Sequence, residues 1–266
     1  MNERYFARIG IPAPAVPDLA GLRAIAAAHT RSIPFENLDS WTGIEVDLDP
    51  AALTAKLVDA RRGGYCFEHN ALLRRVLDDL GYRTTGLSAR VVWGAGPEAP
   101  PGPRSHMLLR VDLPEGPHVV DVGFGGQTLT GVLALEPDVE QATPHEPFRL
   151  RRDGGIHELQ SLIGGQWRPL YRFDQVPTPA ADYEVSNFYV SRHPRSGFVT
   201  GLIAARAAAD RRYALGGRTL AVHRLGGPSQ RRELGSPAEL REVLERDLLI
   251  DTSGLPDLDG HLARLF

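Results

Sequence analysis

The stretch that decides the fold is Arg62-Gly63-Gly64-Tyr65-Cys66-Phe67-Glu68-His69-Asn70. Two successive glycines permit a sharp turn with positive φ, and the apolar spacing that follows predicts a helix from Cys66 or Phe67 to Leu80. The turn thus places the only cysteine of the chain at a helix start. Unpaired N–H groups and the helix dipole favour a thiolate at that position, so Cys66 is a candidate nucleophile. A free cysteine is otherwise most often an inert, buried small hydrophobe.

The sequence predicts three successive segments. Residues 1–83 form a helical bundle carrying the nucleophile, with one helix capped by Asp18 and another beginning at Asp49-Pro50. Residues 84–192 change to a period of two, which predicts an antiparallel β-barrel. Its expected strands are Thr85 to Trp93, His106 to Leu113, His118 to Phe124 and Phe148 to Arg151. Residues 193–266 are mixed, with expected helices at 201–209 and 237–248 and a strand at 218–223.

Composition excludes several classes of protein. The 266 residues carry a net charge of −3, and the arginines are scattered without a basic stripe, which argues against nucleic-acid binding. No apolar run is long enough for a membrane helix, and charges near Met1 exclude a secretory signal. One cysteine forms no internal disulfide and fits a reducing, cytoplasmic compartment. The Cys66, Glu68 and His69 group lacks the paired cysteines of a structural zinc site, so we expect no metal.

A nucleophilic cysteine needs a base, and the base needs an acceptor that orients it. His106 begins one predicted strand and Asp121 lies on the next. Any antiparallel register whose paired numbers sum to an odd value places both side chains on one face of the sheet, and a sum of 227 would set them directly opposite. Sequence alone does not choose the register. Each residue taken singly is equally compatible with an ordinary strand end.

These residues resemble the arylamine N-acetyltransferase family. The resemblance rests on the nine-residue stretch around Cys66 and on four further blocks that occur in the family's order. These are Ile33-Pro34-Phe35-Glu36-Asn37-Leu38, Ser105-His106-Met107-Leu108-Leu109, Val120-Asp121-Val122-Gly123-Phe124-Gly125-Gly126 and Asn187-Phe188-Tyr189-Val190-Ser191-Arg192-His193-Pro194. Together the five blocks span most of the chain.

The resemblance implies an α+β fold: a helical bundle, an antiparallel β-barrel and an α/β lid around a core like that of cysteine proteases and transglutaminases. It implies a Cys66-His106-Asp121 triad that moves an acetyl group from acetyl-CoA to an arylamine, hydrazine or related amine by a ping-pong route. An acceptor pocket of Phe35, Phe124 and Phe198 is implied as well. Gly123, Gly125 and Gly126 would let the backbone approach coenzyme A closely. We also expect Glu36 and Arg62 to pair and brace the loop that holds Cys66.

Three alternatives stay open from the sequence. An amide synthase that releases a polyketide chain as a macrolactam would use the same triad. A peptidase or transglutaminase would share the Cys, His, Asp order, because function resides in the site and not in the fold. A non-enzymatic binding module would instead have an unreactive Cys66. The preferred amine, the preferred acyl donor and the oligomeric state are not decided by the sequence.

Overall fold

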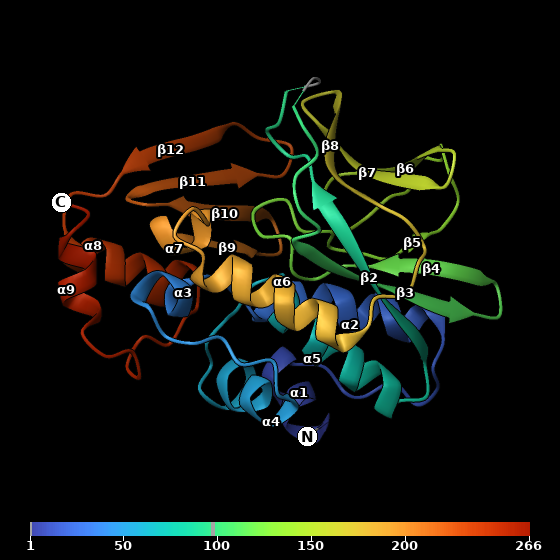
Figure 1. Cartoon of the computed structure of the whole chain (residues 1–266), viewed down its shortest axis with the longest axis horizontal. Helices are drawn as coiled ribbons and strands as arrows, with labels where there is room; N and C mark the ends of the chain where they lie inside the picture. The colour runs from blue at the N-terminus through green and yellow to red at the C-terminus, as the bar shows by residue number, and fades with distance from the viewer. Residues whose placement is uncertain (1, 97–98) are drawn as a thin grey trace.

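A computed structural model describes residues 2–96 and 99–266. Its fold is α+β, with helices gathered below two antiparallel sheets in the view of Figure 1. The first third of the chain is mainly helical. Its elements are α1 (Asn2–Ile9), α2 (Leu19–Ser32), β1 (Phe35–Glu36), α3 (Leu38–Thr42), α4 (Pro50–Leu53), a π-helix (Thr54–Asp59) and α5 (Cys66–Asp79).

The predicted helix signals act as expected at two places. The Asp18 carboxylate accepts a hydrogen bond from the Gly21 N–H at 2.7 Å, which caps α2. Helix α5 begins at Cys66 and is followed by Gly81 in the left-handed region, with φ of 90°. The helix expected from Asp49 is instead divided, because its second half from Thr54 widens into a π-helix.

Within the described residues, the middle of the chain forms a seven-stranded antiparallel sheet that curves into a nearly closed barrel. Its order is β5-β4-β3-β2-β8-β7-β6. The strands are β2 (Arg83–Val91), β3 (His106–Leu113), β4 (Gly116–Val120), β5 (Leu133–Ala134), β6 (Phe148–Asp153), β7 (Ile156–Ile163) and β8 (Gln166–Phe173). The periodicity did not predict β7 and β8, which follow β6 through a short turn.

The hairpin of β3 and β4 confirms that His106 and Asp121 share one face. Leu109 pairs with Val120, so the paired numbers sum to an odd value, although not to the 227 that would place the two residues directly opposite. Strand β4 ends at Val120, earlier than the predicted Phe124. Asp121 is therefore the first residue after the strand.

The last part of the chain builds a second antiparallel sheet, in the order β1-β9-β10-β11-β12. Its elements are α6 (Ala180–Arg192), α7 (Gly197–Thr200), β9 (Ile203–Ala207), β10 (Arg211–Gly216), β11 (Thr219–Arg224), β12 (Ser229–Glu233), α8 (Pro237–Glu242), a π-helix (Val243–Asp247) and α9 (Leu258–Ala263). Strand β1 joins this sheet from the first third of the chain. The segment limits at 83/84 and 192/193 stay predictions.

The helix predicted at 201–209 is wrong, because this segment is strand β9. It lies between β1 and β10, pairing Phe35 with Ala205 on one side and Ala214 with Ala205 on the other. A run of alanines has high helix propensity, but two neighbouring strands satisfy its backbone here. Tertiary pairing overrides the local preference.

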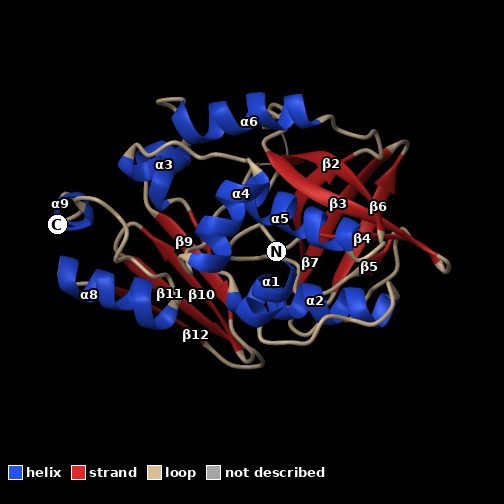
Figure 2. Ribbon diagram, turned by 90° about the horizontal axis from the view of Figure 1, so that it is seen from below, coloured by secondary structure: helices blue, strands red, loops and turns tan. Residues whose placement is uncertain are grey.

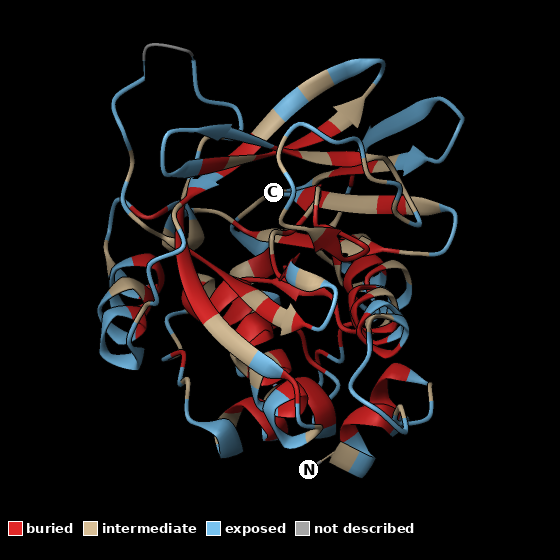
Figure 3. Ribbon diagram, turned by 90° about the vertical axis from the view of Figure 1, so that its right-hand side faces the viewer, coloured by how far each residue is buried: buried red, intermediate tan, exposed pale blue. Residues whose placement is uncertain are grey.

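Helix α5 packs against β2 and β3, whereas α2 packs against β9. Figure 2 shows α1, α4 and α5 seen from below between the two sheets, and Figure 3 shows that buried residues concentrate in the interior while exposed ones lie in the outer loops and strand ends. Helix α5, which begins at Cys66, therefore contacts both the seven-stranded sheet and the neighbouring helix α4. Among the described residues, no helix combines the length and apolarity needed to span a bilayer.

Candidate active site

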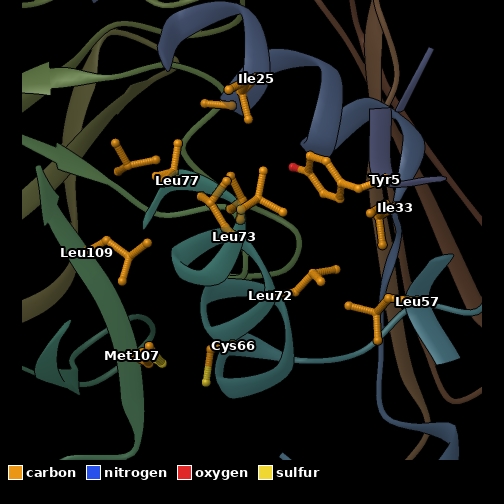
Figure 4. Packing of buried hydrophobic residues seen from close by; sticks show 14 of the residues in the cluster. Tyr5, Ile25, Ile33, Leu57, Cys66, Leu72, Leu73, Leu77, Met107 and Leu109 are labelled. Carbon is orange, nitrogen blue, oxygen red and sulfur yellow. The ribbon is translucent and has the colours of Figure 1, made fainter. Parts of the chain in front are cut away.

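Cys66 is the first residue of α5, and Figure 4 shows it beside Met107 of β3. The expected positive φ at the glycines is wrong: Arg61 has a φ of 51°, while Gly63 and Gly64 lie outside the left-handed region. The glycines are required for close approach instead. A Cβ at Gly63 would lie 2.0 Å from the carbonyl oxygen of Pro34, so no larger residue fits.

His106 and Asp121 form a buried ion pair. His106 Nε2 lies 2.6 Å from Asp121 Oδ2, and the side chains are 3% and 0% exposed. Burial lowers the pKa of His106, but the Asp121 carboxylate and the Cys66 thiol outweigh it and raise that pKa to about 10. Burial also raises the pKa of Asp121, yet His106 holds it below its usual value. The imidazole is therefore cationic at neutral pH. Its Nε2 is used by Asp121, which leaves the Nδ1 proton as its second donor.

Asn70 orients the Asp121 carboxylate, a role that sequence reasoning missed. Its Nδ2 donates to Asp121 Oδ1 at 3.0 Å and to the Met107 carbonyl at 2.8 Å, and its Oδ1 accepts from the Val122 N–H. The Gly123 N–H donates to the same carboxylate oxygen at 3.0 Å. Asn70 lies four residues after Cys66, so both belong to one face of α5, and that spacing was the available signal.

Two aromatic rings enclose the His106 imidazole. Phe124 meets it edge-on, with ring centroids 5.2 Å apart and planes at 89°, and Tyr171 packs against it at 4.7 Å. Tyr171 is fully buried and comes from β8, a strand that the sequence did not predict. The rings exclude water from the imidazole, which strengthens its pairing with Asp121.

One cavity of about 730 Å³ collects nearly all the predicted site residues. Its lining includes Cys66, His106, Phe35, Phe124, Phe198, Gly123, Gly125 and Gly126. Asp121 lies behind His106 and outside this lining. The Phe35 and Phe198 ring centroids lie 6.0 Å apart with planes at 59°, and Gly125 has a φ of 94°, where an added Cβ would lie 3.4 Å from the Phe35 ring. Segments distant in sequence therefore converge on the thiol.

Part of the cavity wall comes from residues that sequence reasoning did not select. Trp93 follows β2, and Thr219, His223 and Arg231 come from β11 and β12. The exposed Arg231 and His223 place polar and cationic groups along one side of the cavity. No local motif marks these residues, because only the pairing of the second sheet brings them to Cys66.

A chain of buried charges braces the loop before Cys66. The predicted pair is confirmed: Arg62 Nη2 lies 2.7 Å from Glu36 Oε1, and it also contacts Asp39 at 2.7 Å. Lys56, the only lysine in the sequence, then bridges Asp39 at 2.6 Å and Glu68 at 2.5 Å. Glu68 in turn accepts from the Tyr65 N–H at 3.0 Å. The charges thus connect β1, α3 and the start of α5.

Within residues 2–96 and 99–266, no group of three or more His, Cys, Asp or Glu side chains is arranged to hold a metal ion. Around the Cys66 thiol and the His106 imidazole the cavity walls are mainly aromatic, aliphatic and glycine-rich, with His223 and Arg231 among the polar residues of the lining. Such a site can perform acyl transfer through a covalent cysteine intermediate.

Comparison with known proteins identifies the family. Residues 18–254 match the family described as N-acetyltransferase, and the chain is 50% identical over 258 residues to the arylamine N-acetyltransferase of Mycolicibacterium smegmatis, covering 96% of this chain and 94% of that protein. The chain belongs to the arylamine N-acetyltransferase family. It is therefore an acyltransferase.

Other relatives of the family agree with this assignment. The arylamine N-acetyltransferase of Mycobacterium tuberculosis is 48% identical over 247 residues, covering 91% of this chain and 87% of that protein. The solved structure of the Mycobacterium marinum arylamine N-acetyltransferase in complex with CoA superposes with a TM-score of 0.94 at 43% identity, covering 100% of this chain and 98% of that one. The fold expected from the resemblance is thereby confirmed.

We predict that Gly63→Ala disrupts the loop before Cys66. The added Cβ would lie 2.0 Å from a backbone oxygen, so the two segments must separate. Thermal unfolding should show a destabilisation of about 1 to 3 kcal/mol, and iodoacetamide should label Cys66 more slowly. Gly155→Ala is the control, because nothing lies within 4 Å of its Cβ and its φ is outside the left-handed region. Equal stabilities of the two variants would contradict the close-approach argument.

We also predict that Arg62→Met destabilises the protein by about 3 to 5 kcal/mol, because it leaves the buried Glu36 carboxylate without its cation. Arg4→Met is the matched control: it breaks the Arg4–Asp59 pair, also at 2.7 Å, but those side chains are 59% and 41% exposed. Its expected cost is below about 1 kcal/mol. Denaturant unfolding measures both, and similar costs would show that the buried chain of charges is not a brace.

Proposed function

We propose that Cys66, His106 and Asp121 form a catalytic triad that transfers the acetyl group of acetyl-CoA to an arylamine, arylhydrazine or related amine. Family membership gives the reaction class, and the relative solved with CoA supports a coenzyme A thioester as donor. The observation that carries the residue assignment is the buried His106–Asp121 pair at 2.6 Å, whose imidazole lines the same cavity as the chain's one thiol. Nucleophile, base and orienting carboxylate thereby have the roles that cysteine acyl transfer needs.

The first half-reaction forms acetyl-cysteine. Cationic His106 stabilises the Cys66 thiolate, whose sulfur attacks the thioester carbonyl and forms the new carbon–sulfur bond. The bond from the acetyl carbon to the sulfur of coenzyme A then breaks, and the His106 imidazolium gives its proton to that leaving sulfur. Thioester exchange is nearly isoenergetic, so positioning and stabilisation of the developing oxyanion matter more than driving force.

The second half-reaction returns the site to its starting state. His106, now neutral, accepts a proton from the amine as its nitrogen attacks the acetyl-cysteine carbonyl. The carbon–sulfur bond to Cys66 breaks, and the Cys66 thiolate and the His106 imidazolium are regenerated together. Asp121 keeps the imidazole oriented through both halves, and its own proton count does not change.

The cavity offers a place for each substrate. Phe35, Phe124 and Phe198 present flat rings against which the face of an arylamine stacks. Gly123, Gly125 and Gly126 have no side chains, so their backbone allows close approach of the pantetheine arm. Arg231 at the exposed side of the cavity supplies a cation for the phosphates of coenzyme A.

The decisive experiment is the intact-protein mass after brief mixing with acetyl-CoA and no amine. We expect the wild type to gain one acetyl group and Cys66→Ala to gain none, because the sequence holds a single cysteine. Addition of aniline or hydrazine should remove the acetyl group, which is the signature of a ping-pong route.

Other outcomes identify other functions. Rapid labelling of Cys66 by iodoacetamide without any acetyl adduct would mean an activated thiol with a different donor, and would favour the polyketide amide synthase. Failure of both reagents would contradict an enzymatic role for Cys66. Acyl transfer from a thioester in the absence of peptide distinguishes the proposed function from a peptidase.

We predict that Asp121→Asn slows the alkylation of Cys66 at pH 7 and the acetyl-transfer rate by a factor of about 10² to 10⁴. The Asp121 carboxylate helps to raise the pKa of His106 to about 10 and so keeps it protonated at pH 7, whereas the amide of asparagine carries no charge to do so. Stopped-flow alkylation of the single thiol measures the effect directly. An unchanged rate would remove Asp121 from the triad.

The difference in unfolding free energy between the wild type and Asp121→Asn should depend on pH. Since the folded pKa of His106 lies above its usual 6.5, its pairing contributes stability fully below about pH 6.5 and loses it as the pH rises toward 10. The stability difference between wild type and Asp121→Asn should therefore shrink over that range. Denaturant unfolding at pH 6, 8 and 10 tests this, and a difference that grows with pH would contradict it.

A further inference from the structure

A buried chain of hydrogen bonds lies behind the catalytic cavity and is not used by the mechanism above. The Tyr5 hydroxyl lies 2.8 Å from His29 Nδ1, His29 Nε2 lies 2.8 Å from His69 Nδ1, and His69 Nε2 lies 3.0 Å from the Pro34 carbonyl oxygen. The three side chains are 0% exposed. Figure 4 shows the Tyr5 hydroxyl pointing inward, toward α5.

The direction of every hydrogen bond in this chain is fixed by its last acceptor. A carbonyl oxygen only accepts, so His69 Nε2 carries a proton. Because burial keeps the His69 ring neutral near neutral pH, its Nδ1 carries none and accepts from His29 Nε2. His29 Nδ1 is then an acceptor as well, and the Tyr5 hydroxyl donates to it. Both imidazoles are neutral and fully satisfied. Burial lowers the pKa of His69 to about 4 and that of His29 well below its usual value, in agreement with this arrangement.

This chain of hydrogen bonds ends at the Pro34 carbonyl, where the segment that leads to Phe35 lies against the loop before Cys66. The Pro34 carbonyl oxygen also accepts from the Gly64 N–H at 3.4 Å, and the Glu36 N–H donates to the Gly64 carbonyl at 2.8 Å. Phe35 follows Pro34 directly, and Cys66 lies two residues after Gly64. The bond from His69 is the shorter of the two on that oxygen, and it ties this crossing to α5.

On α5, His69 lies between two residues whose roles have been described above. Cys66, three residues earlier, carries the thiol, and Asn70, one residue later, holds Asp121 at 3.0 Å. The place of the thiol and of His106 is fixed through Asn70 and Asp121. Phe35, whose ring centroid lies 6.0 Å from that of Phe198, directly follows the Pro34 carbonyl that His69 holds, and on its other side its strand β1 pairs with β9.

We propose that His69 is a positioning residue that sets the distance between the Phe35 wall and the Cys66 thiol, and that His29 and Tyr5 hold it in the tautomer that donates to Pro34. This inference rests on the proposed function, in which Phe35 contacts the ring of the acceptor. The proposal predicts different effects on the two half-reactions. Loss of the His69 hydrogen bond impairs the acceptance of aromatic amines more than the formation of acetyl-cysteine.

The test compares His69→Leu with His69→Gln in the full-length protein. Leucine cannot donate to Pro34 or accept from His29, whereas a glutamine amide offers one donor and one acceptor at a similar separation. We expect His69→Leu to lower kcat/KM for aniline about tenfold, mainly through KM, as for the loss of one aromatic contact. Hydrazine has no ring, so its kcat/KM and the rate of Cys66 acetylation should stay within about twofold. His69→Gln should restore aniline turnover.

Tyr5→Phe is the milder second variant, because it removes only the first donor of the chain. It should change the aniline-to-hydrazine ratio in the same direction as His69→Leu, and by less. Tyr82→Phe is the matched control: its hydroxyl donates to the Asp18 carbonyl at 2.9 Å, in the same helical region, without a link to Pro34. It should lower thermal stability and leave the ratio unchanged.

Equal losses for aniline, hydrazine and Cys66 acetylation in His69→Leu would overturn the proposal, as they would indicate general damage to the fold. A His69→Gln variant as impaired as His69→Leu would overturn it too, because the hydrogen bond would then not be the cause. If His69→Leu does not fold, an unchanged ratio in Tyr5→Phe has the same meaning. Failure of the proposed function is distinct, since wild type would then form no acetyl-cysteine.

Discussion

The buried ion pair between His106 and Asp121 is the constraint on which the rest of the structure depends. A carboxylate with no exposure to water is unfavourable unless its charge is paired and its lone pairs are used. Here the imidazolium, the Asn70 amide and the Gly123 N–H all donate to it. Each donor comes from a different segment, so the helix, the hairpin and the following loop must meet at one point.

Helix α5 satisfies this constraint by making several connections within two turns. Cys66 presents the thiol at the helix start, Glu68 accepts from the Tyr65 N–H and pairs with Lys56, and Asn70 reaches Asp121. His69 adds a hydrogen bond to the Pro34 carbonyl. Buried polar groups that are fully satisfied give a helix a single position, because each shift breaks several bonds at once. The hydrogen bonds of α5 thereby fix the helix start that carries the thiol relative to Asp121 and to Pro34.

Much of the site could be predicted from sequence because local chemistry marks it. The glycine pair, the lone cysteine and the strand-end histidine and aspartate point to a nucleophile, base and acceptor, and the odd register placed His106 and Asp121 on one face. The Glu36–Arg62 pair was predictable as well. Local rules failed where pairing decides: the alanine run at 203–207 is a strand because two strands flank it. The glycines serve close approach and not positive φ.

The sequence by itself identified Cys66 as the candidate nucleophile, because only one thiol is present and its neighbours set the start of its helix. It also determined the α+β class, through the change of hydrophobic period near residue 84. Only the tertiary structure decided which groups enclose the imidazole, how the walls close and what anchors them. Tyr171, Arg231 and the Tyr5–His29–His69 chain come from elements far apart in sequence. Their roles arise from distances in space, which no periodicity along the chain records.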